Sequence, residues 1–121
     1  MNNYGYIKVA AAIPSVKVGD CNYNVSGIEK MIISAEGAGL EVIVFPELSI
    51  TGYTCQDLFR QKHLIDAAER SVVKLLDFTR QLDIISIVGA PVIVGGLLLN
   101  CAIVIQCGEV LGIIPKTFLP N

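Results

Sequence analysis

The chain has 121 residues, of which 53% are hydrophobic and 17% are charged. This composition excludes a disordered chain, and the length fits one domain rather than two. The net charge is −2 and the sequence contains no basic run, so a nucleic-acid-binding surface is not expected. The high mean hydropathy of +0.62 leaves three explanations: a membrane span, a sheet buried on both faces, or a piece of a larger core.

The first half of the sequence predicts strands that alternate with amphipathic helices. Two apolar runs that each end at a proline are expected to be strands: residues 7–13 and 41–45. Apolar residues at helical spacing predict one helix between these strands and a second helix over residues 64–82. A capping box at residues 26–29 would start the first helix, and Gly37 with Gly39 would end it.

The second half carries no charged residue from Ile84 to Gly108, a length that could cross a bilayer as a helix. Pro91, the Gly95-Gly96 pair and many β-branched residues favour strands instead. The expected strands are residues 84–88, 91–94, 97–106 and 110–114, with hairpin turns at Gly95-Gly96 and Gly108-Glu109.

This order of elements predicts an α/β layered fold with a largely parallel sheet at its start. No closing helix follows the late strands, whose apolar side chains therefore lack an evident partner. Strands covered on both faces read as unbroken apolar runs, as these do. The sequence is therefore interpreted as part of a larger domain.

The cysteines are expected to be reduced thiols in a cytoplasmic protein. The four cysteines form no Cys-x-x-Cys pair, and the N-terminus lacks the basic and apolar regions of a secretion signal. Because His63 is the only histidine, no metal site of the usual zinc spacing is expected.

Glu47 and Lys116 are the candidate catalytic residues, because each follows a predicted strand. Functional groups gather beyond the carboxyl ends of strands in α/β sheets. A carboxylate at that position suits a general base, and a lysine can stabilise an oxyanion. The alternatives are a loop-capping or ion-paired carboxylate and a solvated cation. The spacing of 69 residues does not itself bring the two together.

A thiol nucleophile within the chain is a weaker alternative. Cys55 and His63 could pair at the junction of loop and helix, with Asp57 as orienting group, but their spacing does not fix a hydrogen bond. Cys101 and Cys107 lie in or after an apolar strand and are expected to be buried packing residues. The Gly95-Gly96 pair has no following helix and so does not predict a phosphate loop.

Two blocks of the sequence resemble the nitrilase (carbon–nitrogen hydrolase) superfamily. The first is Phe-Pro-Glu-Leu with its continuation Ser-Ile-Thr-Gly-Tyr-Thr-Cys-Gln-Asp-Leu-Phe, within residues 44–59. That continuation is similar to the glutaminase domains of bacterial glutamine-dependent NAD synthetases. The second block comprises residues 100–102, Gly108-x-x-x-Gly112 and residues 114–121. The first strand and Asp20-x-x-x-Asn24 fit the family's opening, so the resemblance covers essentially the whole chain.

The resemblance implies a four-layer α-β-β-α sandwich with a Glu–Lys–Cys triad, of which residues 1–121 would be about the first half. Glu47 matches the general base, Lys116 the oxyanion-stabilising lysine, and Tyr53 a tyrosine of the glutamine pocket. The family's nucleophilic cysteine lies beyond Asn121, as does a synthetase domain that uses ATP and Mg. The implied function is release of ammonia from glutamine for amidation of nicotinic acid adenine dinucleotide to NAD. The chain alone is expected to be inactive and needs no cofactor of its own.

Two other functions stay open at this point. Another nitrilase-type amidase would act on a simple amide or carbamoyl group. The Phe-Pro-Glu and Lys blocks fit it as well, while the continuation Thr-Gly-Tyr-Thr-Cys-x-Asp-Leu-Phe favours the glutaminase. A non-catalytic α/β assembly module is a third reading. A chain that exposes core strands is also expected to form a homo-oligomer.

Overall fold

The computed structural model describes residues 5–52 and 62–116 of the chain. Its elements are β1 (Val9–Ala11), α1 (Cys21–Gly37), β2 (Val42–Val44), α2 (Lys62–Phe78), β3 (Ile85–Val94), β4 (Leu97–Gln106) and β5 (Glu109–Pro115). The strands form one sheet in the order β1-β2-β3-β4-β5. The first three strands run parallel, and β4 and β5 are antiparallel to their neighbours. The predicted α/β order with a parallel start is confirmed.

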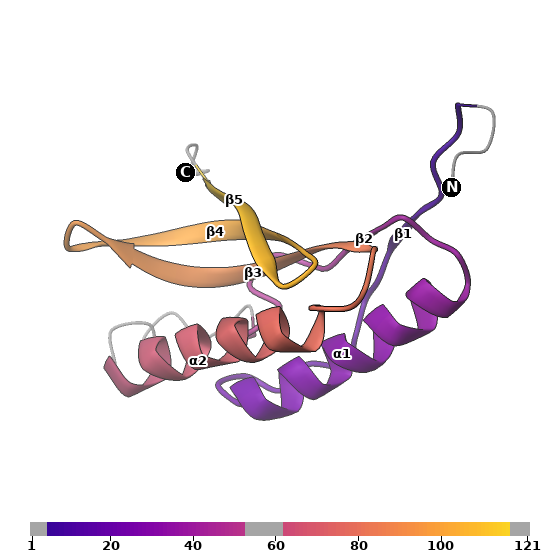
Figure 1. Cartoon of the computed structure of the whole chain (residues 1–121). Helices are drawn as coiled ribbons and strands as arrows, with labels where there is room; N and C mark the ends of the chain where they lie inside the picture. Colours follow the sequence, from indigo (N-terminus) through magenta and orange to yellow (C-terminus); the bar gives the residue numbers. More distant parts are fainter. Residues whose placement is uncertain (1–4, 53–61, 117–121) are drawn as a thin grey trace.

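Both helices lie under the same face of the sheet (Figure 1). The strands β1, β2 and β3 follow one another across the sheet in chain order, with α1 and α2 as the crossovers between them. Right-handed crossovers between parallel strands that are added in one direction place all the helices on one face of the sheet. The core forms between that face and the helices, and it centres on fully buried side chains: Val25, Ile28, Ile32, Leu75, Ile84, Val88 and Ile105.

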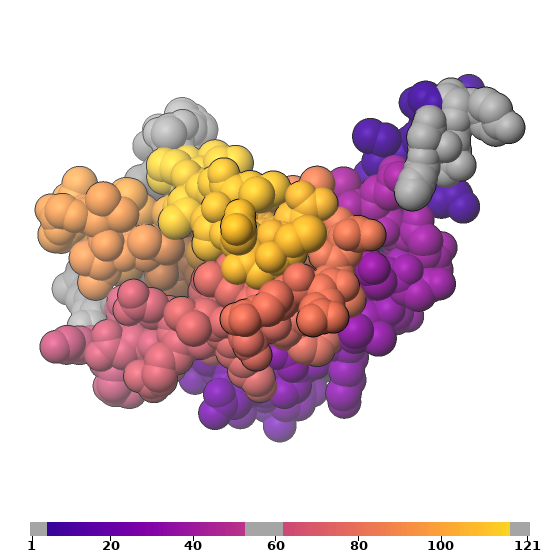
Figure 2. Space-filling view, in the orientation of Figure 1, coloured from indigo at the N-terminus to yellow at the C-terminus, as the bar shows by residue number. Residues whose placement is uncertain are grey.

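The opposite face of the sheet carries apolar side chains without a covering layer in the described part of the chain. We call it the open face, and the strand register places on it Val9, Val42, Val44, Ile85, Ile87, Ala102, Val104 and Ile114. Figure 2 shows the β3–β4 hairpin and β5 outermost, with no helix above them. The described residues thus form two adjacent layers, one of helices and one sheet.

The open face predicts that the isolated 121-residue chain self-associates at micromolar concentration. Val9 and Val44 lie on neighbouring strands of this face and are 62% and 39% exposed. Lysines at both positions should therefore shift sedimentation toward the monomer. Val73→Lys is the control, since Val73 is also an exposed valine, at 58%, but lies on α2. A monomeric unsubstituted chain would contradict this prediction.

The uncharged stretch from 84 to 108 forms a hairpin, and no described helix is long and apolar enough to span a membrane. Two separate strands were expected at 84–88 and 91–94, but β3 is continuous through Pro91. Backbone groups of odd-numbered residues in β3 point away from β4, as the bond from the Phe45 N–H to the Ile87 carbonyl shows. The absent N–H of Pro91 therefore removes no bond to β4.

Three predicted boundaries are wrong. Leu82, which its spacing assigned to the second helix, lies outside α2, which ends at Phe78. The cap of α1 is Asp20, whose side chain accepts a hydrogen bond from the Tyr23 N–H at 3.0 Å, so residues 26–29 lie inside the helix. The second hairpin turn is Cys107-Gly108, with φ of 52° and 79°, and Glu109 already belongs to β5. Two consecutive residues with positive φ are typical of a two-residue hairpin, and Gly95-Gly96 forms the other turn as predicted.

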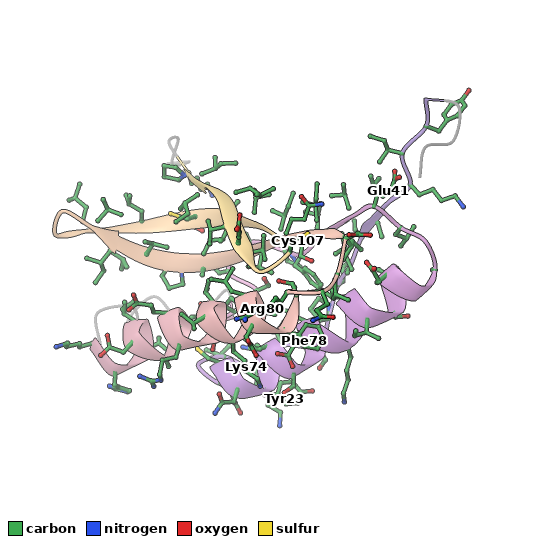
Figure 3. The ribbon with its side chains drawn as sticks, in the orientation of Figure 1. Tyr23, Glu41, Lys74, Phe78, Arg80 and Cys107 are labelled. Carbon is green, nitrogen blue, oxygen red and sulfur yellow. The ribbon has the colours of Figure 1, made fainter. Side chains whose placement is uncertain are left out.

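A half-buried carboxylate between the helices makes the stability depend on pH. Glu29 of α1 is 15% exposed at its side chain, and Lys74 of α2 lies 3.9 Å away (Figure 3 labels Lys74). Burial raises the pKa of Glu29, and the charge of Lys74 offsets this only in part. The folded pKa therefore exceeds the unfolded one, so this group's stabilisation is present at low pH and is lost as the pH rises.

Glu29→Gln should therefore raise the melting temperature at pH 7, by about 2–5 °C, because the amide carries no charge to desolvate. The gain should shrink to nothing as the pH falls to about 4, near the unfolded pKa of glutamate. Thermal unfolding at both pH values measures this, with the exposed Glu69→Gln as control. A stabilisation that is the same at both pH values would contradict it.

Candidate active site

Glu47 lies two residues beyond Phe45, where the chain leaves the carboxyl end of β2. Pro46 ends the strand because it has no N–H to offer a ladder. The following turn places Leu48 at a φ of 55°, an uncommon conformation for a residue with a branched side chain. The turn directs the chain back over β3, so Glu47 stays beside the end of β2.

Hydrogen bonds on two sides fix this turn. The Gly89 N–H of β3 donates to Ser49 Oγ at 3.1 Å, and the Ile50 N–H donates to the Gly89 carbonyl at 3.0 Å. From α1, the fully buried Asn24 donates its Nδ2 to the Ile50 carbonyl at 2.9 Å. A segment held from both the sheet and a helix supports Glu47 rigidly, as a functional group on a loop requires.

Lys116 follows β5, and the structure brings it to Glu47. Its Nζ lies 3.3 Å from Glu47 Oε2, although 69 residues separate the two along the chain. The register of β4 and β5 causes this approach, because the Lys116 N–H donates to the Asn100 carbonyl at 2.8 Å. Asn100 also donates its Nδ2 to Glu47 Oε2, at 2.5 Å. The site is thus a cluster of three polar residues from β4 and from the ends of β2 and β5.

The cluster lines a hollow of about 370 Å³ on the side of the open face. Its other lining residues are apolar or backbone groups of β2, β3, β4 and β5. The side chains of Glu47 and Lys116 remain 38% and 35% exposed, so both can reach a molecule in the hollow. An ion pair this accessible adds at most about 1 kcal/mol to stability, so it has little value as a structural device.

Cys101 is among the residues around the hollow, but it is only 3% exposed. Cys21 and Cys101 are buried, and burial raises the pKa of the Cys101 thiol, which disfavours the reactive thiolate. Cys107 was expected to be buried but is exposed, and its thiol donates to the Leu82 carbonyl at 3.3 Å (Figure 3). Seven residues of strand, or about 20 Å, separate it from Asn100.

The sequence also singled out four further residues and one pair of glycines. Tyr53, Cys55 and Asp57 lie outside the described residues. His63 is exposed in the first turn of α2. The Gly95-Gly96 pair forms the β3–β4 turn.

Sequence reasoning did not assign a role to Asn24, Gly89 or Asn100. Asn100 and Gln106 are the only side chains in β4 with polar hydrogen-bonding groups, apart from the Cys101 thiol. An amide side chain within an otherwise apolar strand is therefore a feature of the sequence that could have marked Asn100 as a candidate site residue. The sequence gives no comparable indication for Gly89, because the need for a glycine there arises from the close packing of the turn after β2 on β3.

A carboxylate beside a lysine, both accessible to one hollow, can perform two parts of amide acyl transfer. The carboxylate can accept the proton of a nucleophile, and the ammonium can stabilise the oxyanion of the tetrahedral intermediate. The pair is therefore compatible with an enzyme that cleaves an amide through a separate nucleophile.

The chain belongs to the carbon–nitrogen hydrolase family, which matches residues 8–118. It is 34% identical over 118 residues to the glutamine-dependent NAD(+) synthetase of Mycobacterium tuberculosis, covering 98% of this chain and 17% of that protein. It is 40% identical over 104 residues to the synthetase of Aquifex aeolicus, covering 86% of this chain and 18% of that protein.

Solved structures agree with this assignment. The glutamine-dependent NAD(+) synthetase from Cytophaga hutchinsonii superposes with a TM-score of 0.88 at 31% identity, over 95% of this chain and 20% of that one. An amidase from Nesterenkonia sp. superposes with a TM-score of 0.78 at 22% identity, over 95% of this chain and 44% of that one, a likeness of fold alone. The nitrilase-type α/β fold predicted from the sequence is confirmed. This chain spans less than a fifth of the length of the synthetases from Mycobacterium tuberculosis and Aquifex aeolicus.

Proposed function

We propose that this chain supplies the general base and the oxyanion-stabilising cation of a glutamine amidohydrolase site. The observation that carries the proposal is the contact of Glu47 with Lys116 at the edge of one hollow. The similarity to glutamine-dependent NAD(+) synthetases over 98% of the chain supports glutamine as the substrate. Tyr53 is proposed to line the glutamine pocket.

The proposed reaction needs a thiol from outside residues 1–121. Glu47 accepts the thiol proton, the sulfur bonds to the side-chain amide carbon of glutamine, and Lys116 stabilises the resulting oxyanion. The carbon–nitrogen bond then breaks, and the nitrogen leaves as ammonia with the proton held by Glu47. Water gives a proton to Glu47 and attacks the thioester carbon. The carbon–sulfur bond then breaks, glutamate leaves, and Glu47 returns the proton to the sulfur, which restores the thiol.

The ammonia is proposed to serve a synthetase domain of the complete protein, where ATP and Mg drive amidation of nicotinic acid adenine dinucleotide to NAD. The 121-residue chain would be the N-terminal portion of the glutaminase domain and inactive alone. A cytoplasmic location and a homo-oligomeric state complete this proposal.

Ammonia release by the natural protein that contains this chain tests the proposal. Selective release from glutamine supports it, whereas release from a simple aliphatic amide would indicate a general amidase instead. A folded protein that releases ammonia from neither would favour the non-catalytic assembly module. The 121-residue chain alone should release none. Release that is lost when one of its own cysteines is replaced would overturn the proposal.

A further inference from the structure

We propose that Asn100 is the positioning residue that sets the geometry of Glu47 and Lys116. This inference rests on the proposed amidohydrolase function and extends it to a residue of β4 that does not itself react. Asn100 is the one described residue that hydrogen-bonds to both Glu47 and Lys116.

The three residues form a closed ring of contacts. The Asn100 side chain donates to Glu47 Oε2 at 2.5 Å, and its carbonyl accepts the Lys116 N–H at 2.8 Å. Lys116 Nζ completes the ring at 3.3 Å from the same carboxylate oxygen. A shift of Asn100 would therefore move the base and the cation relative to one another.

The ring of contacts also determines which carboxylate oxygen of Glu47 is free to accept a proton. Both donors bind Oε2, and no hydrogen bond from residues 5–52 or 62–116 reaches Oε1 of Glu47. Oε1 is thus the oxygen that can accept the thiol proton. With only the half-exposed ion pair to hold it, the carboxylate could rotate and exchange its oxygens.

An amide suits this position better than a charged side chain. Asn100 is neutral, so it orients the carboxylate without adding a second positive charge that would weaken the base. A carboxylate at position 100 would instead repel Glu47, and a leucine would have the size of asparagine without a donor. An asparagine therefore suits a position that orients the Glu47 carboxylate and leaves it able to accept a proton.

Glutaminase kinetics of the natural protein with Asn100→Leu and Asn100→Gln test the inference. Asn100→Leu should lower kcat about 10²-fold, the effect of a misplaced reacting group, with KM changed less than about 2-fold. Asn100→Gln keeps the donor and should restore part of kcat. The control is Gln106→Leu, which removes an amide from the same strand that bonds the Asp83 carbonyl at 2.7 Å, away from the cluster. Its kcat should match that of the unsubstituted protein.

The outcomes separate this inference from the proposed function. No glutamine turnover by the unsubstituted protein would overturn the proposed function. Turnover with an unchanged kcat in Asn100→Leu would overturn the inference alone, as would a loss that Asn100→Gln does not reduce.

A spectroscopic test on the natural protein, isotopically labelled at asparagine, does not require activity. The side-chain amide protons of Asn100 should shift in the NMR spectrum with Glu47→Gln, because the charged acceptor is lost, and should not shift with the remote Glu109→Gln. If Glu47→Gln leaves these signals unchanged, the contact is absent and the inference fails. This measurement decides the question if Asn100→Leu does not fold.

Discussion

Glu47→Gln is expected to lower kcat for glutamine hydrolysis about 10²–10⁴-fold, the usual contribution of a general base. The glutamine side chain has the same size, and its carbonyl oxygen can still accept the bond from Asn100. It cannot accept the proton of a thiol at neutral pH. Turnover should therefore fall while the protein stays folded, and steady-state kinetics with circular dichroism measure both quantities.

Glu109→Gln is the matched control, since Glu109 is an exposed glutamate at the start of β5. Its replacement removes the same charge from the same sheet and should leave kcat within about 2-fold, because surface changes away from a site have small effects. Equal losses in both variants would mean that net charge, rather than Glu47, governs turnover. Full activity of Glu47→Gln would remove the assignment of the base.

Gly89→Ala is expected to have the largest effect on stability and to disable the site as well. A Cβ at position 89 would lie 2.3 Å from the Leu48 nitrogen and 2.9 Å from the Pro46 carbonyl oxygen. Both are backbone atoms of the turn that carries Glu47, so no side chain can swing away to make room. The turn must shift, and the expected loss in unfolding free energy is about 1–3 kcal/mol.

Chemical denaturation of the natural protein measures this loss, and glutamine turnover should fall with it because Glu47 moves. Gly37→Ala is the control: Gly37 is exposed at the end of α1, in the helix layer rather than on the open face, and a Cβ there meets nothing within 4 Å. Its unfolding midpoint should not fall below that of the unsubstituted protein. A stable and fully active Gly89→Ala variant would show that the turn does not pack on β3 as described.

Much of the fold was predictable because its hydrophobic pattern is strong and its breaks are clear. Pro46 and the Gly95-Gly96 pair mark the ends of strands, and the two helices show an apolar face at helical spacing. The cap of α1 was not predictable from local pattern alone. Both Asp20 and Ser26 can cap a helix, and burial of Asn24 against the turn after β2 favours the earlier start.

The site was only half predictable. The sequence places Glu47 and Lys116 at strand ends, but their contact depends on how β4 pairs with β5. That pairing includes a register shift between Val104 and Ile105, which no sequence period indicates. Asn100 is part of a block that resembles the family, yet its hydrogen bond to Glu47 becomes evident only in the folded structure.

Identifying the nucleophile tests the central claim most directly. The natural protein would be treated with a glutamine analogue that carries an alkylating group, and the modified cysteine would be located by peptide mass spectrometry. The account predicts one modified cysteine in a peptide outside residues 1–121, with labelling greatly slowed by Glu47→Gln. Modification of Cys21, Cys55, Cys101 or Cys107 instead, abolished by replacing that cysteine, would contradict the account.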